Sequence, residues 1–252
     1  MALPFEKIEH AIYPRTFLAK VMIGVTFKVD EATLDSDTMQ ERLRVFLENN
    51  FQLEMEPVNF KERMLNIKND EKGIGFIFSH NAVVAFVNGS SYKSFKDSLY
   101  PCVSYLASFL NDVFDVESVT ARTIRKMNVF SLEDEPGANN DLTGTKNLIL
   151  SNEFLQSESE PVDPVLDMDG VEKKLTWKEQ EITINARYQH KLPGEHKIQH
   201  WLDLEVISTP AIQIPIDAVN EYEYWEQMNQ LLFNALHWSI SRNIVQLMTN
   251  PA

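Results

Sequence analysis

The chain is poor in the features that would assign it to a specialised class of protein. It has a single cysteine, Cys102, in 252 residues, so no disulfide can form within it. Glycine and proline number only 8 and 11, which excludes collagen-like and low-complexity sequence. No apolar run approaches the roughly 20 residues of a membrane-spanning helix. The first residues carry charges where a signal peptide has its apolar core, so we expect a cytoplasmic globular protein.

Basic residues are also scarce. Lys and Arg total 23 against 37 Asp and Glu, which gives a formal net charge of -14. A field of this sign repels phosphate backbones and anionic lipid head groups. We therefore expect neither nucleic acid nor a membrane surface as the main partner. Hydrophobic residues make up 44% of the chain, enough for a sizeable core.

Common catalytic motifs are absent from the sequence. It contains no phosphate-binding glycine loop, no G-x-S-x-G and no H-E-x-x-H. Cys102 lies on an apolar stripe at helical spacing, which is typical of a small buried hydrophobe. His237, in the segment LHWSIS, is expected to be a helix histidine with a hydrogen-bond partner, because no nucleophile can be assigned beside it. The sequence thus indicates no catalytic residue and no cofactor, and it favours a protein that is not an enzyme.

Hydrophobic periodicity predicts an α+β fold with an antiparallel sheet and long helices packed on one face. We expect one compact unit over residues 1–252, with two related β-α-β-β-α halves, 1–116 and 117–252, as a further expectation. Asp37 and Gln40 have the spacing of a capping box at the first helix. Pro101 either kinks the second helix or begins it anew. Strands are expected at 17–28, 60–67, 75–79, 82–87, 118–130, 182–188 and 198–206, helices at 37–49, 92–113 and 220–248, and an irregular acidic stretch at 131–170.

Two histidines are predicted to face each other near the tip of a C-terminal hairpin. The hydrophobic pattern requires an odd-length loop centred on Pro193, with Gly194 able to take positive φ. In that register His190 lies opposite His196, with Cβ atoms about 5 Å apart. Two imidazoles at this distance could share a metal ion, yet a metal site normally has a third or fourth protein ligand. The favoured interpretation is exposed polar residues and no metal, with His190 and His196 as the candidate ligands otherwise.

Arg122, Arg125 and Lys126 form the most basic run of this acidic chain. Such a run could bind an anionic ligand or an acidic segment of a partner. On an alternating strand, however, Arg125 shares a side with Met127 and Val129. This pattern favours a partly buried arginine tied to a carboxylate.

Three short motifs resemble a sporadically distributed family of uncharacterised bacterial proteins of about this length. The early strand follows a Tyr/Pro-containing start, YPRTFLAKVMIGVTF. The segment Arg125-Lys126-Met127-Asn128 resembles an Arg-aromatic-x-Asn pattern, with lysine in place of the aromatic residue. LHWSIS resembles a Phe-x-x-Ser-Ile-Thr-like end of the last helix, with leucine in place of phenylalanine. The resemblance implies one compact unit of two halves in a bacterial cytoplasm, and no known activity. We take Arg122, Arg125 and Asn128 as candidate anchors for a ligand or partner.

Two functional interpretations follow from these observations. The first is a non-enzymatic protein-binding or adaptor protein, because the chain has long acidic loops and carries Trp201 on the polar face of its strand. The second is an enzyme or small-ligand-binding protein with a pocket between sheet and helices and Arg125 as an anion anchor. A partly apolar pocket with converging polar groups would favour the second interpretation. A homodimer formed through an exposed sheet edge is a further alternative.

Overall fold

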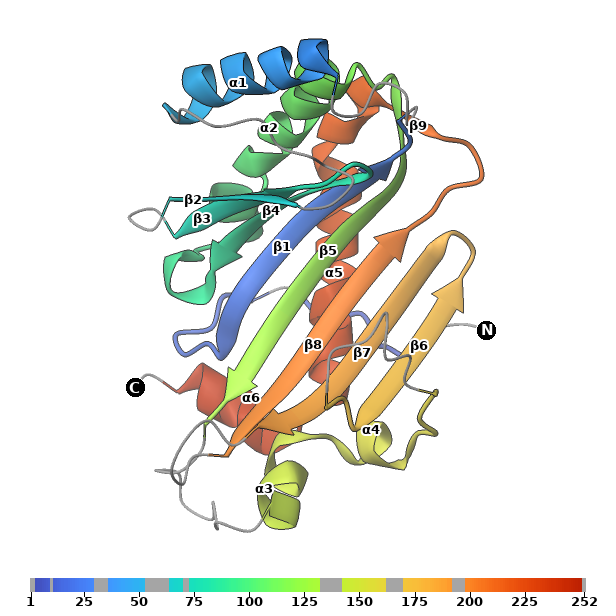
Figure 1. Ribbon diagram of the computed structural model, residues 1–252. Helices are drawn as coiled ribbons and strands as arrows, with labels where there is room; N and C mark the ends of the chain where they lie inside the picture. Colours follow the sequence, from blue (N-terminus) through green and yellow to red (C-terminus); the bar gives the residue numbers. More distant parts are fainter. Residues whose placement is uncertain are drawn as a thin grey trace. The chain divides into compact units, whose positions relative to one another are not determined.

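The computed structural model describes residues 3–9, 11–29, 36–52, 64–69, 73–131, 142–161, 170–191 and 198–250 (Figure 1). Within these ranges the chain forms a nine-stranded antiparallel sheet and six α-helices, which confirms the α+β prediction. None of the described helices is long and apolar enough to cross a membrane.

The chain divides into two compact units that are interleaved along the sequence. Unit 1 comprises 1–21, 125–206 and 227–252, and unit 2 comprises 22–124 and 207–226. The duplication of halves 1–116 and 117–252 stays a prediction, since the boundaries of the two units follow a different division of the chain.

Unit 2 has the strand order β2-β3-β4-β1-β5, and α1 and α2 pack on one face of β2, β3 and β4 (Figure 1). Phe109 of α2 connects these layers. Its ring centroid lies 4.0 Å from that of Phe78 in β3 and 5.3 Å from that of Phe46 in α1. The elements of this unit are β1 (Leu18–Phe27), α1 (Asp37–Phe51), β2 (Leu65–Asn69), β3 (Ile74–Phe78), β4 (Ala82–Asn88), α2 (Pro101–Phe109), β5 (Ser118–Phe130) and β9 (Ile214–Pro215). The strands β1 and β5 continue into unit 1.

The N-cap of the first helix lies one residue earlier than the capping-box pattern predicts. The Ser36 hydroxyl, not Asp37, accepts the hydrogen bond from the backbone N–H of Met39. A serine with extended backbone satisfies one of the amide groups left unpaired at a helix start, so it serves as the N-cap. The helix ends at Phe51, and its C-cap Gln52 has a φ of 54°, in the left-handed region.

Pro101 begins the second helix anew, which is one of the two predicted outcomes. A π-helical turn, η2 (Phe95–Leu99), precedes it, and the N–H of Tyr100 donates to the carbonyl of Phe95 at 2.9 Å. Proline lacks an N–H, and its ring clashes with the preceding turn of a regular helix. It is tolerated at the first position of α2, where that N–H would be unpaired anyway.

Unit 1 has the strand order β1-β5-β8-β7-β6, with α5 behind the sheet in Figure 1. The predicted helix over 220–248 is interrupted: α5 ends at Ser239, and Ile240 pairs with Leu150 in an isolated bridge. Ser241 then caps α6 and donates to the carbonyl of Leu148. The stretch 142–156, expected to be largely irregular, forms two helices. The elements are α3 (Leu142–Ile149), α4 (Asn152–Gln156), β6 (Lys173–Glu179), β7 (Ile182–Lys191), β8 (Gln199–Ser208), α5 (Tyr222–Ser239) and α6 (Arg242–Thr249).

Gly75 in β3 is required by its cross-strand neighbour Phe86 in β4. The two residues are paired, and the ring of Phe86 occupies the space of a side chain at position 75. A Cβ there would also lie 2.8 Å from the carbonyl oxygen of Ile67 in β2.

We expect Gly75→Ala to lower the free energy of unfolding by about 1–3 kcal/mol, because overpacking forces the ring or the strand to move. Chemical denaturation of the single variant and of Gly75→Ala/Phe86→Leu would test this. The smaller side chain at 86 should recover part of the loss, and equal losses in both variants would contradict the explanation.

Candidate functional site

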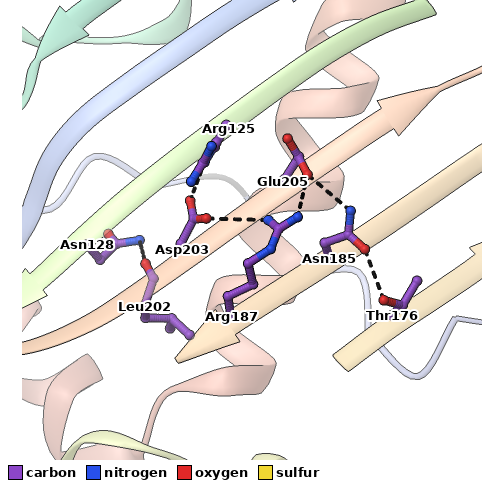
Figure 2. A network of polar contacts seen from close by, with 8 residues as sticks. All are labelled: Arg125, Asn128, Thr176, Asn185, Arg187, Leu202, Asp203 and Glu205. Atoms are coloured by element: carbon purple, nitrogen blue, oxygen red, sulfur yellow. Dashed lines mark hydrogen bonds and ion pairs between the residues drawn. The ribbon is translucent and has the colours of Figure 1, made fainter. Parts of the chain in front are cut away.

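Asp203 in β8 is a buried carboxylate held between two arginines (Figure 2). Its side chain is 1% exposed. Oδ1 accepts from Nε of Arg125 in β5 at 2.7 Å, and Oδ2 accepts from Nη1 of Arg187 in β7 at 3.4 Å. Burial raises the pKa of the Asp203 carboxyl, and the guanidinium groups of Arg125 and Arg187 oppose this shift. One carboxylate thus connects three adjacent strands of unit 1.

The polar contacts continue from Arg187 to the last strand of the sheet (Figure 2). Nη2 of Arg187 donates to Glu205 at 3.2 Å, and the side-chain amide of Asn185 donates to the same carboxylate at 3.1 Å. The hydroxyl of Thr176 in β6 then donates to Oδ1 of Asn185 at 3.0 Å. Residues two apart on a strand share a face, so Asp203 and Glu205 project to the side opposite Leu204. We call Arg125, Asp203, Arg187, Glu205, Asn185 and Thr176 the charge ladder.

The prediction that Arg125 is partly buried and tied to a carboxylate is confirmed. Its side chain is 27% exposed and bound to Asp203. The neighbouring Lys126 lies on the other side of the strand, where its Nζ donates to Oδ1 of Asn229 in α5 at 2.7 Å. Asn128, also buried, donates to the carbonyl of Leu202 at 3.4 Å. These contacts give Arg125, Lys126 and Asn128 structural partners within unit 1.

Arg122 lies in unit 2 and is buried among aromatic rings. Its guanidinium carbon is 4.4 Å from the ring centroid of Tyr224 and 5.6 Å from that of Trp225, and it donates to the carbonyl of Ala218. Burial lowers the pKa of this guanidinium. Three positions separate Arg122 from Arg125, so the alternation of the strand directs their side chains to opposite faces. The basic run of the sequence therefore does not form one basic patch.

Only one histidine of the predicted pair, His190, lies within the described residues. Nδ1 of His190 is hydrogen-bonded to the carboxylate of Glu172. The same carboxylate accepts a hydrogen bond from Nζ of Lys146 at 3.3 Å. His196 lies outside the described residues, so its pairing with His190 stays a prediction. Among the residues that the structure describes, no group of three or more His, Cys, Asp or Glu could hold a metal ion.

His200 in β8 is a fully buried imidazole. Its Nδ1 is hydrogen-bonded to the hydroxyl of Tyr188 at 2.7 Å. Burial lowers the pKa of His200 to about 4, and the charges of His190 and Lys146 add to the effect. The imidazole is therefore neutral at pH 7.

His237 has the hydrogen-bond partner expected from the sequence. Its Nε2 lies 2.8 Å from the hydroxyl of Tyr13, and burial lowers the pKa of the imidazole. Trp201, expected as an exposed aromatic, is instead half-buried, and its indole Nε1 is fully covered.

A cavity of about 610 Å³ lies in unit 2 between the sheet and the helices. One wall is aromatic: the ring centroid of Phe51 is 5.2 Å from that of Phe76 and 5.7 Å from that of Tyr105. Ile67, Ile74, Val87 and Cys102 complete the apolar lining. Its walls therefore come from the last turn of α1, from β2, β3 and β4, and from α2.

Polar groups surround this aromatic wall. Asn49 and Gln52 contribute from the end of α1, and Lys93, Asp97 and Ser98 contribute from the segment before α2. The Asp97 carboxylate accepts from the Ser94 hydroxyl at 2.7 Å, and the Lys93 backbone N–H donates to Ser98 Oγ at 2.8 Å. The cavity thus combines an apolar wall with a few oriented polar groups, as ligand sites commonly do.

Three unusual backbone features border the cavity. Gln52 has positive φ without being glycine, and Asp97 and Ser98 belong to the π-helical turn η2. Gly73, with φ of 61°, leaves room for Ser91 at the end of the cavity. Strained backbone and single π-helical turns are frequent at functional sites. The sequence signalled only the turn before Pro101, because the other lining residues are far apart along the chain.

Cys102 is a protonated thiol in the lining of the cavity. Burial raises the pKa of this thiol to about 11, and its Sγ donates to the carbonyl oxygen of Ser98 at 3.8 Å. A nucleophilic cysteine needs a thiolate. The environment of Cys102 therefore suits a lining residue better than a nucleophile.

Neither a protein-family model nor a curated protein matches the chain, so the family resemblance of its three motifs stays a prediction.

We expect Asp203→Asn to lower the free energy of unfolding by about 3 kcal/mol, because two arginines lose their buried counter-charge. Denaturant unfolding of this variant and of Glu41→Gln would measure it. Glu41 forms an exposed ion pair with Arg44 in α1, so its replacement should change stability little. Similar small effects in both variants would contradict the role of the charge ladder.

The free energy of unfolding should also decrease as the pH is lowered, because His200 is buried in its neutral form. The pKa of about 4 in the folded protein lies below the ordinary value of 6.5, so the unfolded chain binds the proton first. The stabilisation is complete above about pH 6.5 and decreases towards pH 4, by about 3 kcal/mol in all. Unfolding measured across this range should depend less on pH in His200→Asn, and an unchanged dependence would refute the assignment.

Proposed function

We propose that the protein binds a small organic ligand in the cavity of unit 2. The observation that carries the proposal is the combination of an aromatic wall, formed by Phe51, Phe76 and Tyr105, with polar groups around a volume of about 610 Å³. Ligand sites of soluble proteins have volumes of about 300–1,000 Å³ and this mixture of lining groups.

Binding accounts for the lining better than catalysis does. Cys102 has a raised pKa and remains protonated at neutral pH. Asp97 is hydrogen-bonded to Ser94, which orients its carboxylate without supplying a nucleophile or a base. The charged groups of the cavity are therefore suited to orienting a ligand.

Arg125 takes no part in this site. The sequence suggested it as an anion anchor of a pocket, but its Nε is bound to Asp203 within the charge ladder of unit 1. The polar groups assigned to the ligand are instead those of the cavity itself.

Protein binding is a second proposal, supported by two exposed hydrophobic side chains on the helices of unit 2. Val45 in α1 is 41% exposed and Tyr105 in α2 is 40% exposed. Large exposed apolar side chains contribute to protein interfaces when they gather in a patch. The acidic loop 133–141, part of the irregular acidic stretch that the sequence predicts at 131–170, lies outside the described residues. Deleting this loop should abolish binding of a protein partner if the adaptor interpretation holds, and unchanged binding would exclude the loop.

The ligand proposal is tested by filling the cavity. Ser98 lines it and is half-buried, so Ser98→Phe should place a ring inside. We expect native mass spectrometry to detect small molecules from a cell extract that the wild-type protein retains and that Ser98→Phe does not.

Ser104→Phe is the matched control. Ser104 lies six residues further along, in α2, where its side chain is exposed and does not line the cavity. It should retain the same molecules as the wild type. Retention by all three proteins, or by none of them, would contradict the proposal.

A further inference from the structure

Residues 3–9, which we call the strap, pack against α5 of unit 1 without forming a helix or a strand. The ring of Phe5 lies between those of Trp177 in β6 and Trp238 in α5, with centroids 4.9 Å and 5.7 Å away. The two indole rings are 5.1 Å apart, and all three rings meet edge to face, a geometry that aromatic side chains prefer. Phe5 therefore occupies an aromatic slot formed by one strand and one helix.

Two side-chain amides of α5 bind the strap through its backbone. The N–H of Ile8 donates to Oδ1 of Asn234 at 3.2 Å, and the carbonyl of Ile8 accepts from Nε2 of Gln230 at 2.8 Å. Gln230 and Asn234 are four residues apart, so they share a face of the helix, and Gln230 also donates to Oδ1 of Asn234 at 2.9 Å. Every residue except proline has both of these backbone groups. The contact at Ile8 therefore selects no particular side chain.

The strap is held by few polar contacts. Within the described part of the chain, the two hydrogen bonds of Ile8 are the only ones that residues 3–9 make, and these residues form no ion pair. Phe5 and Ile8 are half-buried, whereas Pro4, Glu6 and Lys7 are exposed. Segments with little burial and few hydrogen bonds open at a low cost in free energy.

A cavity of about 820 Å³ adjoins the strap in unit 1. Pro4, Glu6 and Ile8 line it on the side of the strap, and residues of α3, α4, α5 and α6 line the remainder. The strap thus leaves space beside it that a bulkier segment could fill, and filling it would bury more surface than the strap does.

An anchor side chain in a slot and hydrogen bonds to the backbone are the two components of peptide recognition. A segment tethered to its own site competes at an effective concentration on the order of mM, so a partner has to bind more tightly than the strap. The cavity beside the strap provides the additional contacts. We infer that this groove binds an unstructured segment of a partner protein, with an aromatic residue in the place of Phe5 and any residue except proline in the place of Ile8. The strap occupies the groove in the absence of the partner. This groove shares no residue with the cavity of unit 2, so the inference does not depend on the ligand proposed there.

A fluorescein-labelled peptide of residues 3–13, LPFEKIEHAIY, serves as the probe. Fluorescence anisotropy should show that it binds the full-length Phe5→Ala variant about tenfold more tightly than the wild type, because the weakened strap competes less. Ile12→Ala is the matched control, since Ile12 is 74% exposed and lies outside the strap. It should bind the peptide as the wild type does. An affinity of Phe5→Ala no higher than that of the wild type would overturn the inference.

Substituted peptides test how the groove recognises its occupant. Binding of the Ile8→Ala peptide to the Phe5→Ala protein should stay within about threefold of the unsubstituted peptide, because its backbone groups are unchanged. The Ile8→Pro peptide lacks the N–H that Asn234 accepts and should bind about tenfold more weakly, as should the Phe5→Ala peptide. A misfolded protein would not make these distinctions. Equal binding of the alanine and proline peptides would refute recognition through the backbone.

Sedimentation equilibrium separates a partner protein from a second copy of this chain as the occupant. The wild type and Phe5→Ala should have the same oligomeric state, because the strap lies in the groove of its own chain. Dissociation of a wild-type dimer in Phe5→Ala would instead assign the groove to the strap of a second copy and overturn the inference.

Discussion

The buried Asp203 carboxylate constrains unit 1 more than any other single group. Removing an ion from water costs several kcal/mol unless partners compensate for the lost hydration. Arg125 and Arg187 provide that compensation from the two strands adjacent to β8. A slip of β8 by one residue would turn Asp203 to the face that holds Leu202 and Leu204, where the core is apolar. The ion pairs and the apolar core thus specify the same register.

In unit 2, apolar packing holds the strands where ion pairs do so in unit 1. Its β3 and β4 are held by apolar contacts, with Gly75 accommodating Phe86 on one face and Phe78 packing against Phe109 on the other. The chain departs from regular helix where Pro101 requires it, and the resulting π-helical turn places Asp97 and Ser98 in the lining of the cavity. The position of one proline therefore influences both the path of the helix and the polar groups available to a ligand.

Long, regular patterns were the most predictable part of the structure. The thirteen residues of β5 have the bounds expected from the sequence, and burial alternates along the strand from Ser118 to Phe130 except at Ala121 and Arg122, which are both buried. The carboxylate partner of Arg125 was predictable in kind, but its identity as Asp203 depended on strand pairing 78 residues away. The break between α5 and α6 follows from tertiary contacts of Ser241 and Ile240 with α3 and Leu150, which no local pattern indicates. The cavity was missed for the same reason, since its walls come from separate segments.

The single thiol of the chain has a consequence for the conditions in which the protein can work. Cys102 has no second cysteine to pair with, and its raised pKa keeps it in the form that reacts slowly with oxidants. No internal disulfide can therefore open or close the cavity. The shape of the cavity therefore does not depend on the formation of a disulfide within the chain.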